Sequence, residues 1–527
     1  MRTDVIVVGA GFAGMVAALA AAQQNAQVAL LDRNFIGLGT NTALAAGAFT
    51  APVAGYTRET FIAETLKVGK MINHLPSVET ISRESDESFA FLQSLGVNLA
   101  PLPTGFKVSP PRKDIIAGSD LVQRLAQKTD QSPLINTLPG FQVTEILKKD
   151  GSCLGVRGVD HKGNTVSIMT PAVVLATGGA GAIYQRTDNQ RSILGQGYYL
   201  AAQAGLELWD MEFVQFYPLV FNEPTLASLL VYPPYPKETR LINSSGEDLL
   251  AKHGVPDLNE ATKKNRDEMA KMVWQEEQDQ PVYLDFTKLP PEAWERYPGA
   301  FLQRLKFDFK SKPVRISAGA HFFMGGVKAD QDGQTDLPGL FACGEVVWGL
   351  HGANRRGGNA FTECLVCGRL AGLAAAAYAR QTSGFAPQDR PGLQSFASKP
   401  CPGKISLKAL RTQIREIAWE HAGIVRSRKG LEQGLSKLKE LESNLEAAGY
   451  LSLAEYKARH DLKGAAFVLE CILTASLARQ ESRGSFFRQD FPQQDNQHWR
   501  KNSCLSYNSD SKAFSLVHYP PSPPYQG

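Results

Sequence analysis

The distribution of apolar and polar residues predicts alternating strands and helices in the first third of the chain. Residues 4–8 form an apolar run of the buried-strand type, and the glycine-rich turn at residues 9–14 leads into an alanine-rich helix. A second apolar strand ends at Asp32. The order of strand, glycine turn, helix, strand and acidic residue predicts a dinucleotide-binding unit of the Rossmann type.

Further strands and helices follow this unit. Residues 80–96 have a helical pattern, and residues 109–118 are loop-like. Two strand-like segments separated by Asp150 and Gly151 predict a β-hairpin. The apolar run that begins at residue 172 predicts a strand that returns to the first sheet.

The last part of the chain has a helical pattern that begins after the CPGK segment at residues 401–404. A third helix is expected near residues 461–479, and the short connections predict a small antiparallel bundle. Residues 519–527 are rich in proline and predict an extended tail. The apolar positions that define the faces of the first two helices are Leu407, Leu410, Ile414, Ile417 and Ile424, and then Leu431, Leu435, Leu438, Leu441 and Leu445.

The pattern as a whole predicts an α/β fold with three domains. Residues 1–214 and 329–400 are expected to form the two parts of a Rossmann-type nucleotide-binding domain. Residues 215–328, in which prolines and tyrosines are frequent and residues 258–278 look like one charged helix, are expected to form a separate α+β domain inserted into the first. Residues 401–527 are expected to form the C-terminal helical bundle and the tail.

Composition narrows the class of protein. The formal net charge of +4 over 527 residues gives no reason to expect nucleic acid or an anionic membrane surface as a partner. No stretch approaches the roughly 20 uninterrupted apolar residues of a membrane-spanning helix. The apolar N-terminal run has spaced glycines and no separate basic leader, so we interpret it as strand and helix rather than as a signal peptide.

The seven cysteines are scattered, as expected for reduced thiols of a cytoplasmic protein. Cys364 and Cys367 form a CxxC pair on an apparent buried helix, where packing is the expected role rather than a metal site or a disulfide. Because the chain has no partner CxxC pair and no ferredoxin-like cysteine run, we predict no metal site and no iron–sulfur cluster within it.

The glycines of GAGFAG have separate roles in the expected nucleotide site. Gly9 makes the tight turn, Gly11 lets the backbone approach a pyrophosphate, and Gly14 allows close packing of helix against strand. The N-terminus of the helix supplies free N–H groups and a partial positive charge for the phosphates. Asp32 is placed to accept hydrogen bonds from the adenosine ribose. A glycine-rich turn without a ligand is the alternative.

A second set of segments favours FAD over NAD. Residues 176–179 and 338–345 lie far beyond the glycine-rich turn at residues 9–14. FAD-containing folds use additional segments of this kind, whereas an NAD-binding domain does not need them. Glu345 could accept from ribityl hydroxyls, or it could be a charge at a helix N-terminus. The residues expected to bind FAD are Gly9, Ala10, Gly11, Phe12, Ala13, Gly14, Asp32, Arg33, Thr40, Asn41, Thr42, Ala46, Gly47, Thr177, Gly178, Glu345, Asn359, Ala360 and Phe361.

The chain resembles the flavoprotein subunits of the succinate dehydrogenase/fumarate reductase family, which also includes L-aspartate oxidase. The resemblance extends over nearly the whole length and implies an FAD domain, a cap over the flavin ring and a C-terminal helical domain. It also implies interconversion of C–C and C=C bonds beside a carboxylate, with hydride transfer at flavin N5. The motifs that carry it are GAGFAG (9–14), ATGGAGAIY (176–184), DMEFVQF (210–216), SGED (245–248), NRD (265–267), HFFMGG (321–326), HGANRRGGNA (351–360), and ESRG with RQDFP (481–492).

The resemblance also implies roles for individual residues. Arg355 and His321 are similar to the pair that binds the substrate carboxylate, His351 opens the same loop as Arg355, and Arg266 resembles the arginine that transfers the proton. Lys271 stands where the family usually has a second arginine. Such chemistry requires a cationic clamp on the carboxylate and a proton donor held in line. On residue type alone, Arg266 also fits a solvated helix charge, and His321 fits a core histidine.

The chain departs from the family at two places. Asn41 replaces the histidine that is covalently joined to FAD in membrane-bound relatives, so FAD is expected to be non-covalent. Tyr217 and Leu219 replace a histidine and a threonine, and the Thr-Glu pair that follows in the family is missing from residues 227–236. These changes predict an enoate other than plain fumarate, with one carboxylate or a bulky far end, unless a cap residue such as Lys237 or Arg240 supplies the missing charge.

Three functions are compatible with the sequence. The leading hypothesis is an enoate reductase or succinate-type dehydrogenase subunit, with catalytic residues Arg266, His321, Arg355, His351 and Tyr217. It would act on a small carboxylic acid and exchange electrons with a separate protein, such as an iron–sulfur subunit. The alternatives are an enzyme like L-aspartate oxidase and a non-catalytic FAD-bearing scaffold or RNA-modification component. We expect a cytoplasmic protein, free or held at a membrane by a partner subunit, without nucleic-acid binding or direct membrane insertion.

Overall fold

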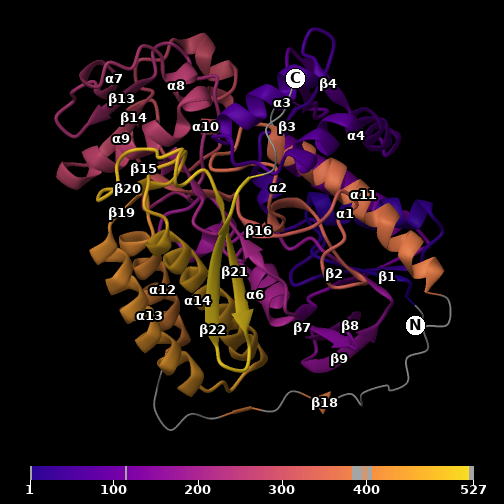
Figure 1. The fold of residues 1–527 in the computed structure, drawn as a ribbon. Coiled ribbons are helices and arrows are strands. Elements are labelled where there is room, and N and C mark those ends of the chain that lie inside the picture. The colour runs from indigo at the N-terminus through magenta and orange to yellow at the C-terminus, as the bar shows by residue number, and fades with distance from the viewer. Residues whose placement is uncertain (1–2, 113–114, 383–393, 396–397, 400–405, 522–527) are drawn as a thin grey trace.

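The computed structural model describes residues 3–112, 115–382, 394–395, 398–399 and 406–521 (Figure 1). Its first domain contains a five-stranded parallel sheet, which confirms the Rossmann-type fold. The three central strands of this sheet, at residues 5–8, 28–32 and 172–175, are short, buried and rich in valine and leucine, as expected for a parallel sheet covered on both faces. In spatial order they are β17 (Leu340–Ala342), β10 (Ala172–Leu175), β1 (Val5–Val8), β2 (Val28–Asp32) and β6 (Ile135–Pro139).

Two apolar helices pack together against this sheet. α1 (Phe12–Gln23) and α11 (Asn359–Gln381) run side by side (Figure 1). A Cβ atom on Gly372 would lie 2.2 Å from the carbonyl oxygen of Ala17, so glycine is what allows this close approach. By length and composition alone α11 could cross a membrane, but half of its most apolar part is buried. We therefore interpret α11 as a core helix.

Smaller elements complete the domain. The hairpin expected around Asp150 and Gly151 is confirmed, and both residues have the positive φ (51° and 75°) that a tight two-residue turn requires. The elements are α2 (Asn41–Leu44), α3 (Arg58–Val68), α4 (Leu75–Ser94), α5 (Ala117–Gln131), α6 (Gln196–Gln203), the 3₁₀ turns Gly181–Ile183 and Gly344–Val346, β3 (Ala48–Thr50), β4 (Leu99–Leu102), β5 (Gly105–Val108), β7 (Gln142–Lys149), β8 (Ser152–Val159), β9 (Asn164–Met169) and β18 (Gln394–Ser395).

The cap contains a four-stranded antiparallel sheet with short helices around it, which confirms its α+β character. The helix expected at 258–278 is in fact two helices, because Asn265 leaves the helical conformation (φ −123°, ψ 42°). The break places Arg266 at the first position of the second helix. The elements are β12 (Val214–Phe221), β15 (Val314–Phe323), β14 (Val282–Asp285), β13 (Arg240–Asn243), α7 (Leu249–Lys252), α8 (Leu258–Lys264), α9 (Arg266–Asp279), the 3₁₀ turn Pro291–Glu295 and α10 (Gly299–Leu302).

The C-terminal domain has the three expected helices, α12 (Leu407–His421), α13 (Arg428–Ala447) and α14 (Leu453–Ala478). α14 begins earlier than the sequence indicated, because Ser452 caps it together with Glu455. Ile424, assigned to the face of the first helix, lies beyond its end. The CPGK segment and the end of the tail lie outside the described residues.

Sequence analysis missed a hairpin near the end of the chain. β21 (Asn502–Asn508) and β22 (Ala513–Tyr519) pair with each other and extend a sheet that contains β11 (Leu208–Trp209) and β16 (Gly326–Val327). This hairpin is the long pair of arrows beside α14 in Figure 1. The C-terminal segment is therefore not only helical, and it returns to the strands that flank the cap. A second small pairing joins β19 (Val425–Arg426) to β20 (Phe487–Arg488).

Candidate active site

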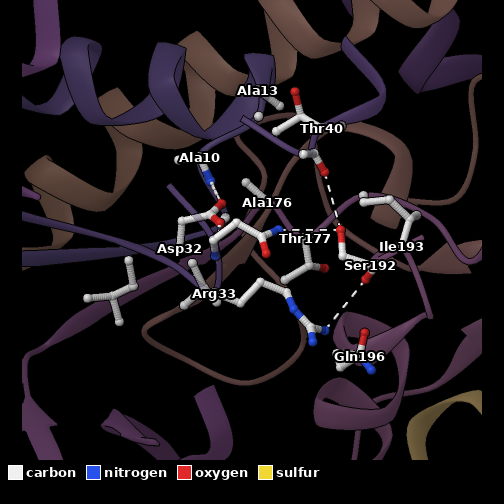
Figure 2. Close-up of a pocket in the computed structure, with 18 of the residues that line it drawn as sticks. Ala10, Ala13, Asp32, Arg33, Thr40, Ala176, Thr177, Ser192, Ile193 and Gln196 are labelled. Atoms are coloured by element: carbon white, nitrogen blue, oxygen red, sulfur yellow. Dashed lines mark hydrogen bonds between the residues drawn. The ribbon is translucent and has the colours of Figure 1, made fainter. Parts of the chain in front are cut away.

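A cavity lies at the carboxyl end of the parallel sheet (Figure 2), the edge at which such sheets bind ligands. Its wall includes residues of the glycine-rich turn at 9–14 and of the two later segments, 176–179 and 338–345, that were expected to contact FAD. The predicted cofactor residues that line it are Gly9, Ala10, Gly11, Phe12, Ala13, Asp32, Arg33, Thr40, Asn41, Thr42, Thr177, Gly178 and Glu345.

The shape of the glycine turn fits a bound pyrophosphate. Gly9 has φ +105°, and a Cβ atom there would lie 2.4 Å from the carbonyl oxygen of Ala176. A Cβ atom on Gly14 would lie 1.9 Å from the carbonyl oxygen of Gly9, so Gly14 is needed for helix packing. Gly11 gives the start of α1 no side-chain cap; the N–H of Phe12 donates to Thr42 Oγ1 at 3.4 Å, and the other N–H groups of the first turn are left for a ligand. Thr177 Oγ1 is buried on the cavity wall without a partner among the described residues. These features fit FAD.

Asp32 fixes the turn around the cavity. Its Oδ2 accepts from the N–H of Ala10 at 2.8 Å, a bond drawn in Figure 2, and its Oδ1 accepts from the N–H of Asn34 at 2.7 Å. Burial raises the pKa of the Asp32 carboxyl. The adjacent Arg33 also lines the cavity, but its guanidinium is paired with Asp461 of α14. Asp461 therefore ties the C-terminal domain to the cofactor site.

Glu345 lies in the 3₁₀ turn at the other side of the cavity. Its Oε1 accepts from the N–H of Phe323, the last residue of β15, at 3.1 Å. Burial raises the pKa of this carboxyl to about 7. Glu345 thus links the cavity to the strand that carries the next group of predicted residues.

Six predicted cofactor residues lie off the cavity wall, and their contact with FAD remains a prediction. Phe361 packs against the rings of Phe12 and Phe49. Asn359 donates to Thr65 Oγ1 at 3.1 Å, while its Oδ1 is buried without a partner among the described residues. The six residues are Gly14, Ala46, Gly47, Asn359, Ala360 and Phe361.

Asn41 is the residue that the sequence resemblance sets in place of a flavin-linking histidine, and it lies on the cavity wall. Its Nδ2 donates to Asn189 Oδ1 at 2.7 Å, and its Oδ1 accepts from the N–H of Gln190 at 2.9 Å. The side chain thus holds the 186–190 loop, and an amide cannot form the flavin link.

We therefore expect FAD to be bound non-covalently. Acid precipitation of the holoenzyme should release yellow flavin into the supernatant, because no bond joins it to Asn41 or to a neighbouring histidine. Flavin fluorescence that remains with the denatured polypeptide on a gel would contradict this prediction.

Arg355 and His321 meet where the cap faces the cofactor domain. Arg355 Nη2 lies 2.8 Å from His321 Nε2, and His321 Nδ1 lies 2.6 Å from Asp188 Oδ2. Because a guanidinium only donates, Nε2 is the acceptor, and Nδ1 carries the proton donated to Asp188. His321 is neutral in this arrangement, and burial lowers the pKa of its imidazole.

Gln215 of β12 joins Arg355 to Arg266. Its Oε1 accepts from Arg355 Nε at 3.1 Å and from Arg266 Nη1 at 3.3 Å, and its Nε2 donates to the carbonyl oxygen of Arg355 at 2.9 Å. The two guanidinium groups therefore converge on one space. Burial, followed by the charge of Arg266, lowers the pKa of Arg355 to about 10.

Tyr217 closes the far side of this space. The guanidinium of Arg266 lies 5.1 Å from the centre of the Tyr217 ring, and the His321 ring lies 5.3 Å from it. The Tyr217 hydroxyl is 3.4 Å from that of Tyr235, and Tyr232 packs edge-on against the Tyr217 ring. The cap therefore presents neutral phenols at this end of the space.

Neither Lys237 nor Arg240 supplies the missing charge. Arg240 is paired with Asp285 at the outer edge of the cap sheet, and Lys237 is exposed. Lys271, on the second cap helix, lies 4.7 Å from the ring of Phe487 and lines a separate cavity at the C-terminal segment.

His351 supports the site from behind. Its Nε2 lies 3.0 Å from Glu363 Oε2, and its ring packs edge-on against Phe322. The guanidinium of Arg355 lies 4.8 Å above the same Phe322 ring. We interpret His351 as a residue that positions Arg355, because no described contact joins it to the other catalytic candidates.

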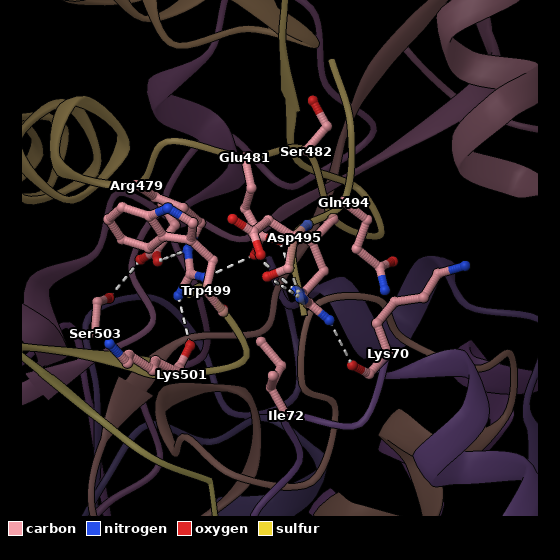
Figure 3. Close-up of polar contacts among 12 residues, drawn as sticks. Lys70, Ile72, Arg479, Glu481, Ser482, Gln494, Asp495, Trp499, Lys501 and Ser503 are labelled. Atoms are coloured by element: carbon pink, nitrogen blue, oxygen red, sulfur yellow. Dashed lines mark hydrogen bonds and ion pairs between the residues drawn. The ribbon is translucent and has the colours of Figure 1, made fainter. Parts of the chain in front are cut away.

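A buried charge network anchors this region (Figure 3). Arg479 donates to Glu212 at 2.7 Å and to Glu481 at 3.0 Å, and Arg483 donates to Glu481 at 2.7 Å. All four side chains are fully buried. Glu212 lies just before β12, so the network fixes the start of the strand that carries Gln215.

The same C-terminal segment holds the loop that presents Arg355. The N–H and the hydroxyl of Ser485 donate to the carbonyl oxygen of Ala353 at 3.0 and 3.1 Å. Gly484 has φ +56°, and a Cβ atom there would lie 2.4 Å from that oxygen. Gly484 of the ESRG motif and the adjacent Ser485 therefore support the loop that presents Arg355.

Sequence reasoning missed two residues of the site. Gln215 belongs to the DMEFVQF motif and could have been found there, because that motif was singled out without a role for its glutamine. Asp188 lies four residues after the ATGGAGAIY segment, and no motif or spacing marked it. Among the described residues, no group of three His, Cys, Asp or Glu side chains could hold a metal ion, and Cys364 and Cys367 are free thiols.

Comparison with known proteins agrees with the fold and with FAD as the cofactor. A family model described as an FAD binding domain matches residues 4–361, and one described as the fumarate reductase flavoprotein C-term matches residues 411–522. A fumarate reductase (CoM/CoB) subunit of Methanothermobacter marburgensis is 30% identical over 541 residues, which cover 95% of this chain and 97% of the relative. L-aspartate oxidase of Mesorhizobium japonicum is 30% identical over 510 residues, which cover 93% and 92%.

A solved structure of the E. coli quinol fumarate reductase with a FrdA mutation superposes with a TM-score of 0.85 and 25% identity, covering 99% of this chain and 97% of that one. Fold and cavity thus define an FAD-dependent oxidoreductase. The chain belongs to the succinate dehydrogenase/fumarate reductase flavoprotein family, which confirms the resemblance seen in the sequence.

Proposed function

We propose that this enzyme reduces the C=C bond of an α,β-unsaturated acid other than plain fumarate. The carboxylate would lie against His321 and Arg355, with the rest of the substrate between the flavin and the cap. The observation that carries the proposal is the convergence of Arg266 and Arg355 on one acceptor, Gln215, directly beside His321.

The clamp would act on the developing charge. When the β-carbon accepts a hydride, negative charge spreads toward the carboxylate, and the guanidinium of Arg355, held by His321 and Gln215, stabilises that charge more strongly than in the ground state. FAD, when bound, supplies the hydride chemistry. Gln215 orients both guanidinium groups, so neither has to reorganise during the reaction.

Arg266 would deliver the proton to the α-carbon. Its guanidinium is fixed between Gln215 and the Tyr217 ring, and its Nε is buried without a partner among the described residues. A guanidinium is a weak acid. Its role as proton donor therefore depends on being held in line with the α-carbon by Gln215 and the Tyr217 ring.

The phenols of the cap support a substrate with a weakly polar far end. A second ionised carboxylate there would meet Tyr217 and Tyr235 in place of cations, at a cost of several kcal/mol. An aromatic or aliphatic group would instead pack against their rings. We therefore favour a monocarboxylate, or a substituted enoate whose far end is bulky.

Electrons would come from a separate protein. One relative is named as a subunit, which supports a partner for this chain as well. Because the chain has no ferredoxin-like cysteine run, an iron–sulfur partner is one suitable donor. We further propose a cytoplasmic protein that reaches a membrane only through such a partner.

An amine-oxidising enzyme is the second candidate, since an L-aspartate oxidase is 30% identical to this chain. It is disfavoured by the absence of a charged far clamp for the second carboxylate of aspartate among the described cap residues. A non-catalytic FAD-bearing scaffold is also disfavoured, because it would not need Arg266, His321 and Arg355 to converge in a buried space.

Turnover assays separate these candidates. Holoenzyme with a reduced viologen dye should reduce unsaturated acids, while L-aspartate with oxygen should give little hydrogen peroxide. Purification from the native source, followed by mass spectrometry, should identify the electron partner. Peroxide formation from aspartate without enoate reduction would instead favour the oxidase.

A further inference from the structure

Asp188 adds a carboxylate to the site that no sequence motif predicted. It lies on the loop after the 3₁₀ turn Gly181–Ile183, and its side chain is only 8% exposed. Its Oδ2 contacts His321 Nδ1 at 2.6 Å, and its Oδ1 accepts from Asn189 Nδ2 at 3.0 Å. Asn189 also donates to the carbonyl oxygen of His321 at 2.9 Å, so the loop holds His321 from two directions.

We propose that Asp188 restricts the site to substrates with a single carboxylate. Two cations, Arg266 and Arg355, face the space between cap and flavin domain, and Asp188 cancels one of these charges. His321 adds none, because its Nε2 accepts from Arg355. The remaining positive charge is neutralised by one substrate carboxylate. This inference rests on the proposed function.

The other groups that face this space do not change the balance. Tyr217, Tyr235 and Tyr232 are neutral phenols, and burial raises the pKa of Tyr217. Glu345, on the flavin side, can only reduce the positive charge when it ionises. A second substrate carboxylate would therefore enter a buried region without net positive charge, which is unfavourable.

The proposal predicts how selectivity changes when the charge is removed. Asp188→Asn keeps an oxygen that can accept from His321 but removes the negative charge. Removing a unit negative charge about 10 Å from the second carboxylate of a ligand, in a medium of effective dielectric constant about 20, should change the affinity for that ligand by roughly tenfold. The near carboxylate is common to both ligand classes, so any loss of His321 orientation cancels in the ratio of their affinities.

The test is a titration of the holoenzyme, followed by flavin absorbance, with succinate and with 3-phenylpropionate. The wild type should bind 3-phenylpropionate more tightly. Asp188→Asn should shift the ratio of the two dissociation constants toward succinate by roughly tenfold. Asp188→Glu, which keeps the charge, should leave the ratio near that of the wild type even if both ligands bind more weakly.

A matched control is Asp120→Asn, because Asp120 is a similarly buried carboxylate paired with Arg124 on α5, away from the cap. It should leave the ratio unchanged. If Asp188→Asn loses FAD, Asp188→Thr replaces it as the neutral variant. An unchanged ratio in the flavin-bound neutral variant, or the same shift in Asp188→Glu, would overturn the proposal. Turnover with reduced viologen is measured separately, so a failure of the proposed reaction does not obscure the binding result.

Discussion

Arg266→Ala is expected to lower kcat by on the order of 10²–10⁴-fold, the usual effect of removing a general acid. The substitution removes the group that Gln215 and Tyr217 hold beside the clamp, but it leaves Arg355 and His321 to bind the carboxylate. KM should therefore change much less than kcat. The measurement is steady-state reduction of an unsaturated acid by the flavin-loaded variant.

Two comparisons make this result specific. Lys264→Ala removes an exposed cation two residues earlier in the chain, which forms an ion pair with Glu260, and should leave turnover unchanged. Arg355→Ala should raise KM as well as lower kcat, because its carboxylate contact exists in both the ground state and the transition state. Near-normal turnover by Arg266→Ala would show that another group donates the proton.

Arg479→Ala is expected to lower the free energy of unfolding by about 3–5 kcal/mol, because it leaves Glu212 as a buried carboxylate without its cation, while Glu481 keeps its pair with Arg483. The loss should also loosen the start of β12 and so weaken the position of Gln215. Denaturant unfolding of the holoenzyme, followed by flavin release and by circular dichroism, measures the effect.

The control for this prediction is Arg428→Ala, which removes an exposed ion pair with Glu432 on α13. Exposed pairs contribute about 0–1 kcal/mol, so its midpoint should hardly change. If Arg479→Ala and Arg428→Ala unfold at the same denaturant concentration, the buried network does not stabilise the domain arrangement in the way we infer.

The parts of the fold with strong local signals could be predicted from the sequence. The buried strand at residues 4–8, the glycine turn and Asp32 define the nucleotide unit locally, since strand burial and turn conformation depend on near neighbours. The same holds for the three C-terminal helices. The clamp residues Arg266, His321 and Arg355 were found through motifs, and the structure brings them together from three distant segments.

Features that depend on tertiary contacts could not be predicted. Asp188 becomes part of the site only because its loop packs against β15, and nothing near it in the sequence shows that contact. The hairpin at residues 502–519 is stabilised by β11, nearly three hundred residues earlier. The break at Asn265 separates two helices whose composition resembles one, because charged residues continue across it and no glycine or proline marks it.

The comparison of kcat/KM for fumarate and for acrylate- and cinnamate-type acids, with a reduced viologen dye as electron donor, tests the central claim most directly. The arrangement of Arg355 and His321 at one end and Tyr217 with Tyr235 at the other predicts higher kcat/KM for the monocarboxylic acids, with fumarate and succinate as poor substrates. Fumarate exceeding them by more than about tenfold in kcat/KM would show that the tyrosine-lined cap accepts a dicarboxylate, and would contradict the account.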